Sequence, residues 1–286
     1  KALTIAGSDS GGGAGIQADL KTFSAFRVFG MSVITAVTAQ NSLGVQGVEN
    51  LPPAFVALQL RSVLSDFGAG AAKCGMLSTA PIIEAVAATL ANDPVEKLVV
   101  DPVMVAKSGD TLLQPEARQA LIERVLPLAL MVTPNLPEAA KLLGGGQGKN
   151  EREMSTQAGA LRRLGAKAVL IKGGHLLTDR ATDLLYDGRF FNVFKGEFIE
   201  TPHTHGTGCT FSAAIAANLA RGEKLEEAVA DAKKYITSAI RSGFRIGQSV
   251  MHPKFGLGVI INAEGSGTDA RVQVNFGNAG MKWLAL

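Results

Sequence analysis

Short apolar runs alternate with helical patterns along most of the chain. The runs are continuous, which is typical of strands that are buried on both faces of a parallel sheet. This order predicts repeated βαβ units. We expect strands at 3–6, 33–37, 71–76, 98–100, 130–132 and 168–171, and helices at 16–23, 53–67, 81–90, 114–125, 136–143, 155–164, 211–219 and 225–240.

The predicted fold is α/β, with a mostly parallel sheet and helices on both faces. Such a sheet binds ligands beyond the carboxyl ends of its strands. The polar and glycine-rich motifs of this chain each lie just after a predicted strand. Residues 183–195 differ, because Asp187-Gly188 between two alternating runs predicts an antiparallel hairpin. The glycine-rich stretch 144–150 is expected to be a surface loop, since the alternation resumes after it.

The pattern changes near the end of the chain. From residue 246 onward, short alternating strands and glycine turns replace the βα units. We therefore expect two domains, an α/β domain over 1–245 and a small all-β tail over 246–286.

Composition narrows the functional classes. The 286 residues carry a formal net charge of +3, which argues against binding nucleic-acid phosphates over the whole surface. Only two cysteines, no secretory leader and no apolar run of about 18 residues favour a cytoplasmic protein without a membrane segment. The four histidines are not paired with the cysteines at zinc-ligand spacing, so the sequence has no transition-metal motif.

The segment Thr204-His205-Gly206-Thr207-Gly208-Cys209-Thr210 predicts an anion-binding helix start. Its glycines let backbone N–H groups converge, and the following helix adds unpaired donors and the positive end of its dipole. Cys209 falls in the first turn, where the dipole is expected to lower the thiol pKa so that the group accepts a proton from a substrate hydroxyl. The alternative is an ordinary buried cysteine at a helix start.

A second glycine-rich motif, Gly7 to Gly15, connects the first predicted strand to the first predicted helix. Its spacing is not that of the dinucleotide-binding fingerprint, and the chain has no Gly-x-x-x-x-Gly-Lys-Ser/Thr motif. The loop is either a tight βα turn or a ligand-binding loop.

These two motifs and six others follow the order found in the ribokinase-like superfamily. Over about the first 245 residues the chain resembles the bacterial hydroxymethylpyrimidine/phosphomethylpyrimidine kinases of thiamine biosynthesis. The motifs are Ala6-Gly7-Ser8-Asp9 with Gly12-Gly13-Ala14-Gly15-Ile16-Gln17-Ala18-Asp19, Thr38-Ala39-Gln40-Asn41, Lys73-Cys74-Gly75-Met76-Leu77, Asp101-Pro102-Val103-Met104, Lys107-Ser108-Gly109, Thr133-Pro134-Asn135-Leu136-Pro137-Glu138-Ala139, Lys172-Gly173-Gly174-His175 and the Cys209 segment.

The resemblance implies a kinase that uses MgATP to phosphorylate 4-amino-5-hydroxymethyl-2-methylpyrimidine and then its monophosphate. Related sugar kinases have aspartate in place of Cys209, so the cysteine favours a pyrimidine alcohol. The implied catalytic residues are Cys209 as base or proton relay, the backbone anion hole Gly206, Thr207 and Gly208, and Lys172. The implied ATP-phosphate contacts are Lys172, Asn135 and Thr207.

The resemblance also implies a metal site and an acceptor pocket. Asp101 and Glu138 would hold Mg²⁺, although helix capping is the alternative for Asn135 and Glu138. Lys107-Ser108-Gly109 would form a loop that closes over the phosphates. The implied substrate-binding residues are Gln40, which presents a donor and an acceptor to an aminopyrimidine, Met76, which packs on its ring, and Gly7, Asp19 and Val103.

The tail departs from this kinase family, whose usual Gly-Pro-x-x-His-type ending is missing. It resembles the Tudor-like (SH3-like) module of UvrD-type repair helicases in His252, Phe255-Gly256, Gly258 and Lys282-Trp283. That module is a small β-barrel that docks on protein partners such as RNA polymerase. We expect Trp283 to lie in the barrel core rather than in a docking surface.

Two alternatives to the pyrimidine kinase remain open from the sequence. One is a kinase of pyridoxine-like alcohols, which would share the fold and the Cys209 site. The other is a fusion that acts mainly as a protein-binding module through its tail. The kinase family commonly forms homodimers, so a dimer is expected.

Overall fold

The computed structural model describes residues 1–41, 44–104, 112–174, 176, 181–201, 204–241, 249–264 and 271–285. The chain divides into two compact units, one made of residues 1–198 and 205–234 and the other of residues 199–204 and 235–286. Each unit has a sheet of its own.

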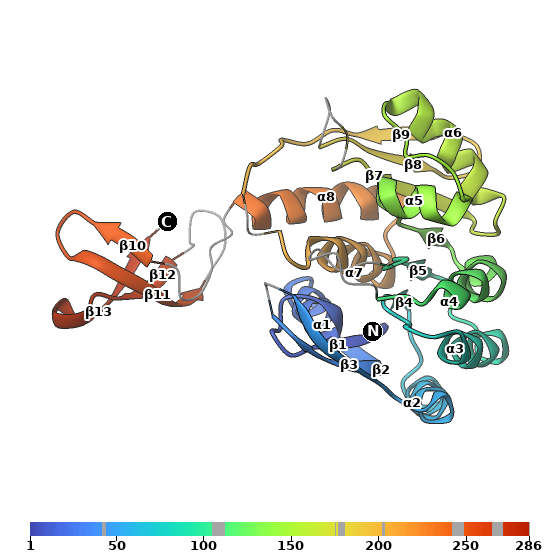
Figure 1. Cartoon of the computed structure of the whole chain (residues 1–286), viewed down its shortest axis with the longest axis horizontal. Helices are drawn as coiled ribbons and strands as arrows, with labels where there is room; N and C mark the ends of the chain where they lie inside the picture. Colours follow the sequence, from blue (N-terminus) through green and yellow to red (C-terminus); the bar gives the residue numbers. More distant parts are fainter. Residues whose placement is uncertain are drawn as a thin grey trace. The chain divides into compact units, whose positions relative to one another are not determined.

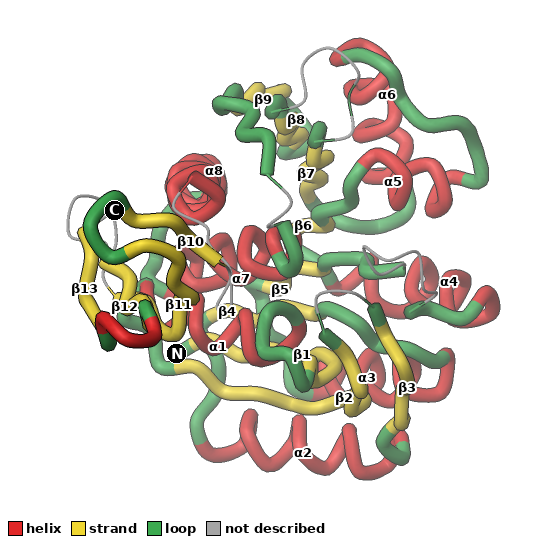
Figure 2. Tube along the Cα trace, turned by 60° about the vertical axis from the view of Figure 1, so that its left-hand side comes forward, coloured by secondary structure: helices red, strands yellow, loops and turns green. Residues whose placement is uncertain are grey.

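The first unit is built on a nine-stranded sheet in the order β3-β2-β1-β4-β5-β6-β7-β8-β9. The six central strands, β2, β1, β4, β5, β6 and β7, pair in parallel. At the two edges of the sheet, β3 on one side and β8 and β9 on the other pair antiparallel. Figure 2 shows the strands following one another in this order. Their bounds are β1 Ala2–Asp9, β2 Gly30–Gln40, β3 Val45–Asn50, β4 Ala71–Cys74, β5 Leu98–Val100, β6 Met131–Val132, β7 Ala168–Lys172, β8 Asp183–Tyr186 and β9 Phe191–Phe194.

Helices cover both faces of this sheet. Figure 1 shows α1 and α7 on one side and α2 to α6 on the other. Their bounds are α1 Gly15–Ala25, α2 Pro53–Asp66, α3 Ala80–Asn92, α4 Pro115–Ala120, α5 Leu136–Leu143, α6 Glu151–Arg162, α7 Thr207–Ala220 and α8 Leu225–Arg241. None of the helices that the structure describes combines the length and apolar character needed to cross a membrane.

The predicted α/β fold is confirmed. The six predicted strands and eight predicted helices are present, and 183–195 contains the antiparallel pair β8–β9. The helix expected at 114–125 is α4 followed by a π turn, Leu121–Val125. Strand β3 was not among the predicted strands. Five of its six residues are exposed, and an exposed edge strand lacks the apolar run that reveals a buried strand.

The strand order reverses beside β1. The chain runs from β1 to β2 on one side and then returns to place β4 on the other side of β1. Parallel sheets bind ligands at such a switch point, beyond the carboxyl ends of the strands. The motifs after β1, β2, β4, β5, β6 and β7 therefore meet at one edge of the sheet.

A charged pair lies inside the core at this switch point. Lys73 in β4 places Nζ 2.8 Å from Asp19 Oδ1 of α1, and both side chains are fully buried. Thr4 of β1 donates to Asp19 Oδ2 at 2.6 Å. Burial alone would lower the pKa of Lys73, but the attraction and hydrogen bond of Asp19, together with the smaller effects of other nearby acidic groups, outweigh burial and raise this pKa. The pair thus ties β1, α1 and β4 together beneath the edge where the motifs meet.

The second unit contains a four-stranded antiparallel sheet in the order β10-β11-β12-β13. Ile260, Val272, Val274 and Phe276 form its core. A Cβ on Gly258 would overlap the Phe276 ring, so the close packing of β11 requires glycine there. The predicted all-β tail is confirmed. Its strands are β10 Ser249–His252, β11 Gly256–Glu264, β12 Arg271–Asn275 and β13 Met281–Ala285.

The prediction that Trp283 lies in the tail core is wrong. Trp283 pairs with Gln273 across β12 and β13, one position out of step with the buried Val272 and Val274. Side chains alternate between the faces of a strand, so this register puts the indole on the outer face, where it is 39% exposed. The Arg271 guanidinium lies 4.9 Å from the indole ring centroid.

Replacing Lys73 by Met should destabilise the first unit strongly, because Asp19 would be left as an unpaired buried charge. We expect the free energy of unfolding to fall by about 3–5 kcal/mol, measured by chemical denaturation. Lys234→Met, which removes an exposed pair with Asp231, is the matched control and should leave the unfolding midpoint close to that of the unchanged chain. Equal effects of the two substitutions would contradict the proposed importance of the buried pair.

Candidate active site

The start of helix α7 forms the centre of the site. Gly206 is the N-cap and has a left-handed conformation with φ of 78°. A Cβ at this position would overlap the carbonyl oxygen of Gly13, so the close approach of the two loops also requires glycine. Thr207, Gly208 and Cys209 form the first turn, where backbone N–H groups and the helix dipole favour an anion.

Cys209 lies half-buried at the meeting point of two helix N-termini. The backbone N–H of Gly15, the first residue of α1, favours the thiolate form of Cys209, although less than the neighbouring charges affect it. Burial raises the pKa of the Cys209 thiol, and although Lys73 opposes this effect, it does not reverse it. The expected lowering of the Cys209 pKa at the helix start is therefore wrong, and the group is a thiol at neutral pH.

Lys172 and Asp101 form an ion pair beside this helix start. Lys172, the last residue of β7, places Nζ 2.7 Å from Asp101 Oδ1, and Thr133 Oγ1 donates to the same oxygen at 3.2 Å. Ser212 Oγ of α7 donates to Asp101 Oδ2 at 3.1 Å. A Cβ built on Gly208 would lie 3.6 Å from Lys172 Nζ and 3.8 Å from Asp101 Oδ2. The predicted anion hole and the two charged residues are therefore neighbours.

Burial raises the pKa of Asp101, but the attraction of Lys172 and Lys73 outweighs it and holds this pKa below its ordinary value. Burial would lower the pKa of Lys172, yet Asp101 and Glu138 raise it above its ordinary value. Both groups are therefore charged at neutral pH.

Glu138 and Asn135 form a capping box at the start of α5. Asn135 Oδ1 accepts from the Glu138 N–H at 2.8 Å, and Glu138 Oε2 accepts from the Asn135 N–H at 2.8 Å. The helix-capping alternative for Asn135 and Glu138 is therefore confirmed by their hydrogen bonds. Burial raises the pKa of Glu138 to about 7; Lys172 opposes this shift, and repulsion from Asp101 adds to it. The charges of Lys172 and Asp101 therefore both act on the Glu138 carboxyl.

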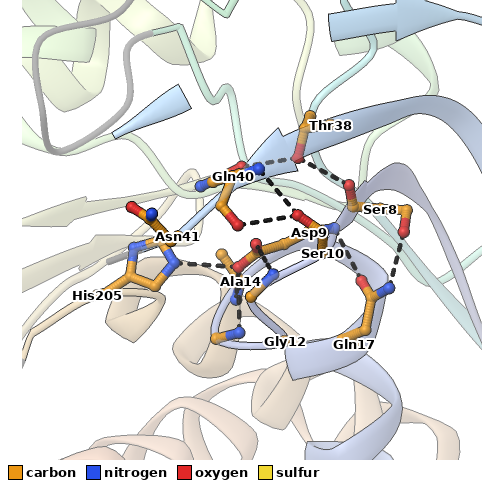
Figure 3. Close-up of polar contacts among 12 residues, drawn as sticks. Ser8, Asp9, Ser10, Gly12, Ala14, Gln17, Thr38, Gln40, Asn41 and His205 are labelled. Atoms are coloured by element: carbon orange, nitrogen blue, oxygen red, sulfur yellow. Dashed lines mark hydrogen bonds and ion pairs between the residues drawn. The ribbon is translucent and has the colours of Figure 1, made fainter. Parts of the chain in front are cut away.

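The residues predicted to bind the acceptor lie around the switch point. A Cβ on Gly7 would lie 3.4 Å from the Met76 sulfur and terminal carbon, so Met76 covers this part of β1. Gln40 is half-buried at the end of β2, and its Oε1 accepts from Thr38 Oγ1 at 3.1 Å (Figure 3). Val103 is half-buried just after β5.

Gly15 connects the acceptor side to the anion side. A Cβ on Gly15 would overlap the carbonyl oxygen of Gly7, and the Gly15 N–H favours the thiolate form of Cys209. Gly7 and Cys209 therefore lie on either side of one residue. The predicted acceptor pocket and the predicted catalytic residue meet at this point.

Asp19 and the closing loop are the remaining predicted participants. Asp19 is fully buried, and Lys73 and Thr4 bond to its carboxylate, so in this structure it supports the pocket from below. The predicted closing loop, Lys107-Ser108-Gly109, lies outside the described residues.

The glycine-rich loop after β1 is closed by its own aspartate. Asp9 Oδ1 accepts from the Gly11 N–H at 2.8 Å, and Asp9 Oδ2 accepts from the N–H groups of Gly13 and Ala14 at 3.1 Å and 2.8 Å. Burial raises the pKa of Asp9, but hydrogen bonds from His205, Gly11 and Ala14 outweigh it and lower this pKa. The loop is thus a tight βα turn around an internal anion.

His205 was missed as a structural partner in the sequence analysis. Its Nε2 lies 3.0 Å from Asp9 Oδ2, although the two residues are 196 positions apart (Figure 3). The signal that was available is an aspartate at a strand end followed by three glycines, which is typical of a carboxylate enclosed by backbone N–H groups.

The fold and the site define a phosphotransferase of the ribokinase-like class. Residues 9–254 match the phosphomethylpyrimidine kinase family, and residues 246–285 match the PcrA/UvrD tudor domain. The chain belongs to the phosphomethylpyrimidine kinase family.

Three similar proteins illustrate this membership. The hydroxymethylpyrimidine/phosphomethylpyrimidine kinase of Rhizobium meliloti (strain 1021) is 56% identical over 245 residues, which cover 86% of this chain and 92% of that protein. The crystal structure of phosphomethylpyrimidine kinase from Clostridium difficile 630 has a TM-score of 0.76 and 47% identity, covering 84% of this chain and 98% of that one. An ADP complex of Bacillus subtilis pyridoxal kinase has a TM-score of 0.80 and 45% identity, covering 86% and 93%.

Alkylation of Cys209 by iodoacetamide should require a higher pH than alkylation of a free thiol. The raised pKa reduces the thiolate fraction at neutral pH. The alkylation rate, measured by mass spectrometry, should therefore keep rising with pH beyond the ordinary pKa range of a cysteine. Cys74 is the internal control, because its thiol is fully buried and burial raises its pKa to about 12. A Cys209 rate that is already maximal at neutral pH would contradict the direction of the shift.

Proposed function

We propose that this chain transfers the γ-phosphate of ATP to the hydroxyl of 4-amino-5-hydroxymethyl-2-methylpyrimidine, and then a second phosphate to the monophosphate. The observation that carries the proposal is the meeting of the α7 helix start, the Lys172–Asp101 pair and the close approach of Met76 to Gly7. One location therefore offers phosphate donors, charge and an acceptor slot, as phosphoryl transfer requires.

In the proposed reaction the acceptor oxygen attacks the γ-phosphorus and the bond to ADP breaks. The hydroxyl proton passes to the Cys209 sulfur while the thiol gives its own proton to an oxygen of the phosphoryl group. Because the Cys209 pKa is raised, the thiol does not ionise the acceptor in advance. Phosphoryl transfer has a loose transition state, so the proton need not leave before the new bond begins to form. Cys209 therefore acts as a proton relay close to the helix dipole rather than as a preformed thiolate.

The backbone N–H groups of Gly206, Thr207 and Gly208 would bind the oxygens of the transferred phosphoryl group. Lys172 and Asn135 would contact the phosphates of ATP from the ends of neighbouring strands, since the Lys172 N–H donates to Pro134 O at 2.8 Å. Lys172 is only 14% exposed, so its charge is little screened by solvent.

The donor set fits Mg²⁺ in the way this ion is usually held. Among the described residues no three His, Cys, Asp or Glu side chains gather as a metal site, whereas Mg²⁺ commonly uses one or two carboxylates and completes its shell with phosphates and water. Asp101 and Glu138 supply two carboxylates that repel each other across the site. When bound there, Mg²⁺ would neutralise charge on the phosphates of ATP.

Gln40 and Met76 would recognise the pyrimidine. The Gln40 amide offers a donor and an acceptor to the ring edge, while Met76 packs against the ring face beside Gly7, and Val103 completes the slot. Asp19 acts through Lys73 in this proposal, because its carboxylate is fully buried. A pyridoxine-type alcohol is the second candidate, supported by the similarity to the pyridoxal kinase of Bacillus subtilis.

Purified chain should convert the hydroxymethylpyrimidine to its monophosphate and then to the diphosphate with MgATP, identified by mass, and turn over pyridoxine more slowly. Cys209→Ala should reduce turnover by about 10²- to 10⁴-fold, the usual effect of a positioned acid–base group. Cys74→Ala, a buried cysteine of the same unit, is the matched control. Faster turnover of pyridoxine would favour the second candidate, and unchanged turnover in Cys209→Ala would remove that residue from the mechanism.

We further propose that residues 246–286 form a separate protein-binding domain attached to the kinase domain 1–245. The observation that favours binding is the outer face of the tail sheet, where Met251, Leu257, Met281 and Trp283 are 73%, 63%, 62% and 39% exposed. An exposed apolar patch containing Trp is typical of a protein interface. RNA polymerase is the candidate partner. The homodimer and the cytoplasmic location remain predictions.

Immobilised full-length chain should retain RNA polymerase, and Trp283→Ala should weaken this retention. Phe190→Ala is the matched control, because Phe190 is a 68% exposed aromatic side chain of the first unit. Kinase turnover should be equal in both variants. Equal retention by the Trp283 variant, or no retention by the unchanged chain, would rule out this surface as a docking site for that partner.

A further inference from the structure

The loop between β1 and α1 and the loop before α7 meet at one carboxylate. Asp9, the last residue of β1, is 2% exposed and accepts hydrogen bonds from Gly11, Gly13 and Ala14. Its Oδ2 also lies 3.0 Å from His205 Nε2. Figure 3 shows the imidazole pointing at this carboxylate from the other loop.

The chemistry of the contact defines which nitrogen of the His205 ring carries a hydrogen. An ionised carboxylate only accepts hydrogen bonds, and the lowered pKa keeps Asp9 ionised at neutral pH. His205 Nε2 must therefore carry a hydrogen and donate it. The bond is charge-assisted, and such bonds are about twice as strong as neutral ones.

The surrounding backbone leaves little room for alternative arrangements. A Cβ on Gly13 would lie 2.6 Å from His205 Cδ2, and a Cβ on Gly206 would overlap the Gly13 carbonyl oxygen. The two loops are thus in contact on both sides of the hydrogen bond. A displacement of His205 would move Gly206, which is the N-cap of α7.

Asp9 is also connected to the acceptor side. Ser10, the next residue, donates from Oγ to Gln40 O at 2.9 Å and accepts from the Gln40 N–H at 2.8 Å. One continuous set of contacts therefore runs from Gln40 through Ser10 and Asp9 to His205 and the α7 helix start (Figure 3).

We propose that His205 is a positioning residue, which through Asp9 fixes the α7 anion hole at its working distance from the acceptor pocket. This inference rests on the proposed function for the identity of the two subsites. His205 touches neither substrate in this proposal. Its effect is on the alignment of the acceptor hydroxyl with the phosphoryl group, and a misplacement of about 1 Å at such a site can cost about 10²-fold in rate.

The test compares His205→Ala, His205→Gln and Lys21→Ala in the full chain. Glutamine can place an N–H near the position of Nε2, so it should restore the bond to Asp9. Lys21→Ala is the matched control, because Lys21 is exposed and donates to Gly12 O in the same glycine loop at 2.8 Å without reaching the α7 loop.

We expect kcat of His205→Ala to fall about 10- to 100-fold. The KM values for ATP and hydroxymethylpyrimidine should stay near those of the unchanged chain. His205→Gln should recover most of the loss, and Lys21→Ala should have unchanged kcat. Full activity of His205→Ala, no recovery in His205→Gln, or an equal loss in Lys21→Ala would overturn the inference.

A second readout separates this inference from the proposed function. Alkylation of Cys209 by iodoacetamide reports the position of the α7 start without any substrate, and Cys74 serves as the internal reference. His205→Ala should alkylate several-fold faster at Cys209, while His205→Gln and Lys21→Ala should match the unchanged chain. If the unchanged chain phosphorylates none of the alcohols, the proposed function fails, whatever the alkylation rates are. Equal alkylation rates at Cys209 in all variants would overturn the positioning role of His205, whatever the turnover is.

Discussion

The buried pair between Lys73 and Asp19 is the interaction on which the site depends. Two charges removed from water must satisfy each other, so the positions of β4 and α1 are coupled through the 2.8 Å contact. Thr4 adds β1 to this coupling. These three elements bound the switch point of the sheet, and the proposed acceptor-binding residues and Cys209 lie close to them. A misplaced Lys73 would therefore alter the geometry and the electrostatics of the site together.

The site combines two helix N-termini, those of α1 and α7, whose backbone N–H groups have different roles. The amides before α1 are used by Asp9, the chain's own carboxylate, whereas the α7 start is capped by Gly206, which has no side chain to occupy it. This difference explains why two glycine-rich motifs of similar appearance have different roles. The first is a closed turn that supports the pocket, and the second is suited to receive a phosphoryl group.

Most of the fold could be predicted from the sequence because buried parallel strands are continuous apolar runs. The exposed edge strand β3 could not, since five of its six residues face solvent. Trp283 was misplaced because the face of a strand depends on register, which depends on pairing rather than on residue type. The predicted lowering of the Cys209 pKa was wrong for a similar reason, because burial is a property of the packed structure. The Asp9–His205 contact joins residues 196 positions apart and has no local pattern.

The capping box at α5 has a consequence for the genetics of this protein. Glu138 both closes the first turn of α5 and supplies a carboxylate to the proposed metal site. An inactivating change at this codon would fray a helix and remove a negative charge in one step, so an allele here cannot be assigned to either cause from its phenotype. Codon 135 separates the causes only in part, because a change there disturbs the same helix turn and leaves the carboxylate in place, but it also removes a proposed contact to the phosphates of ATP.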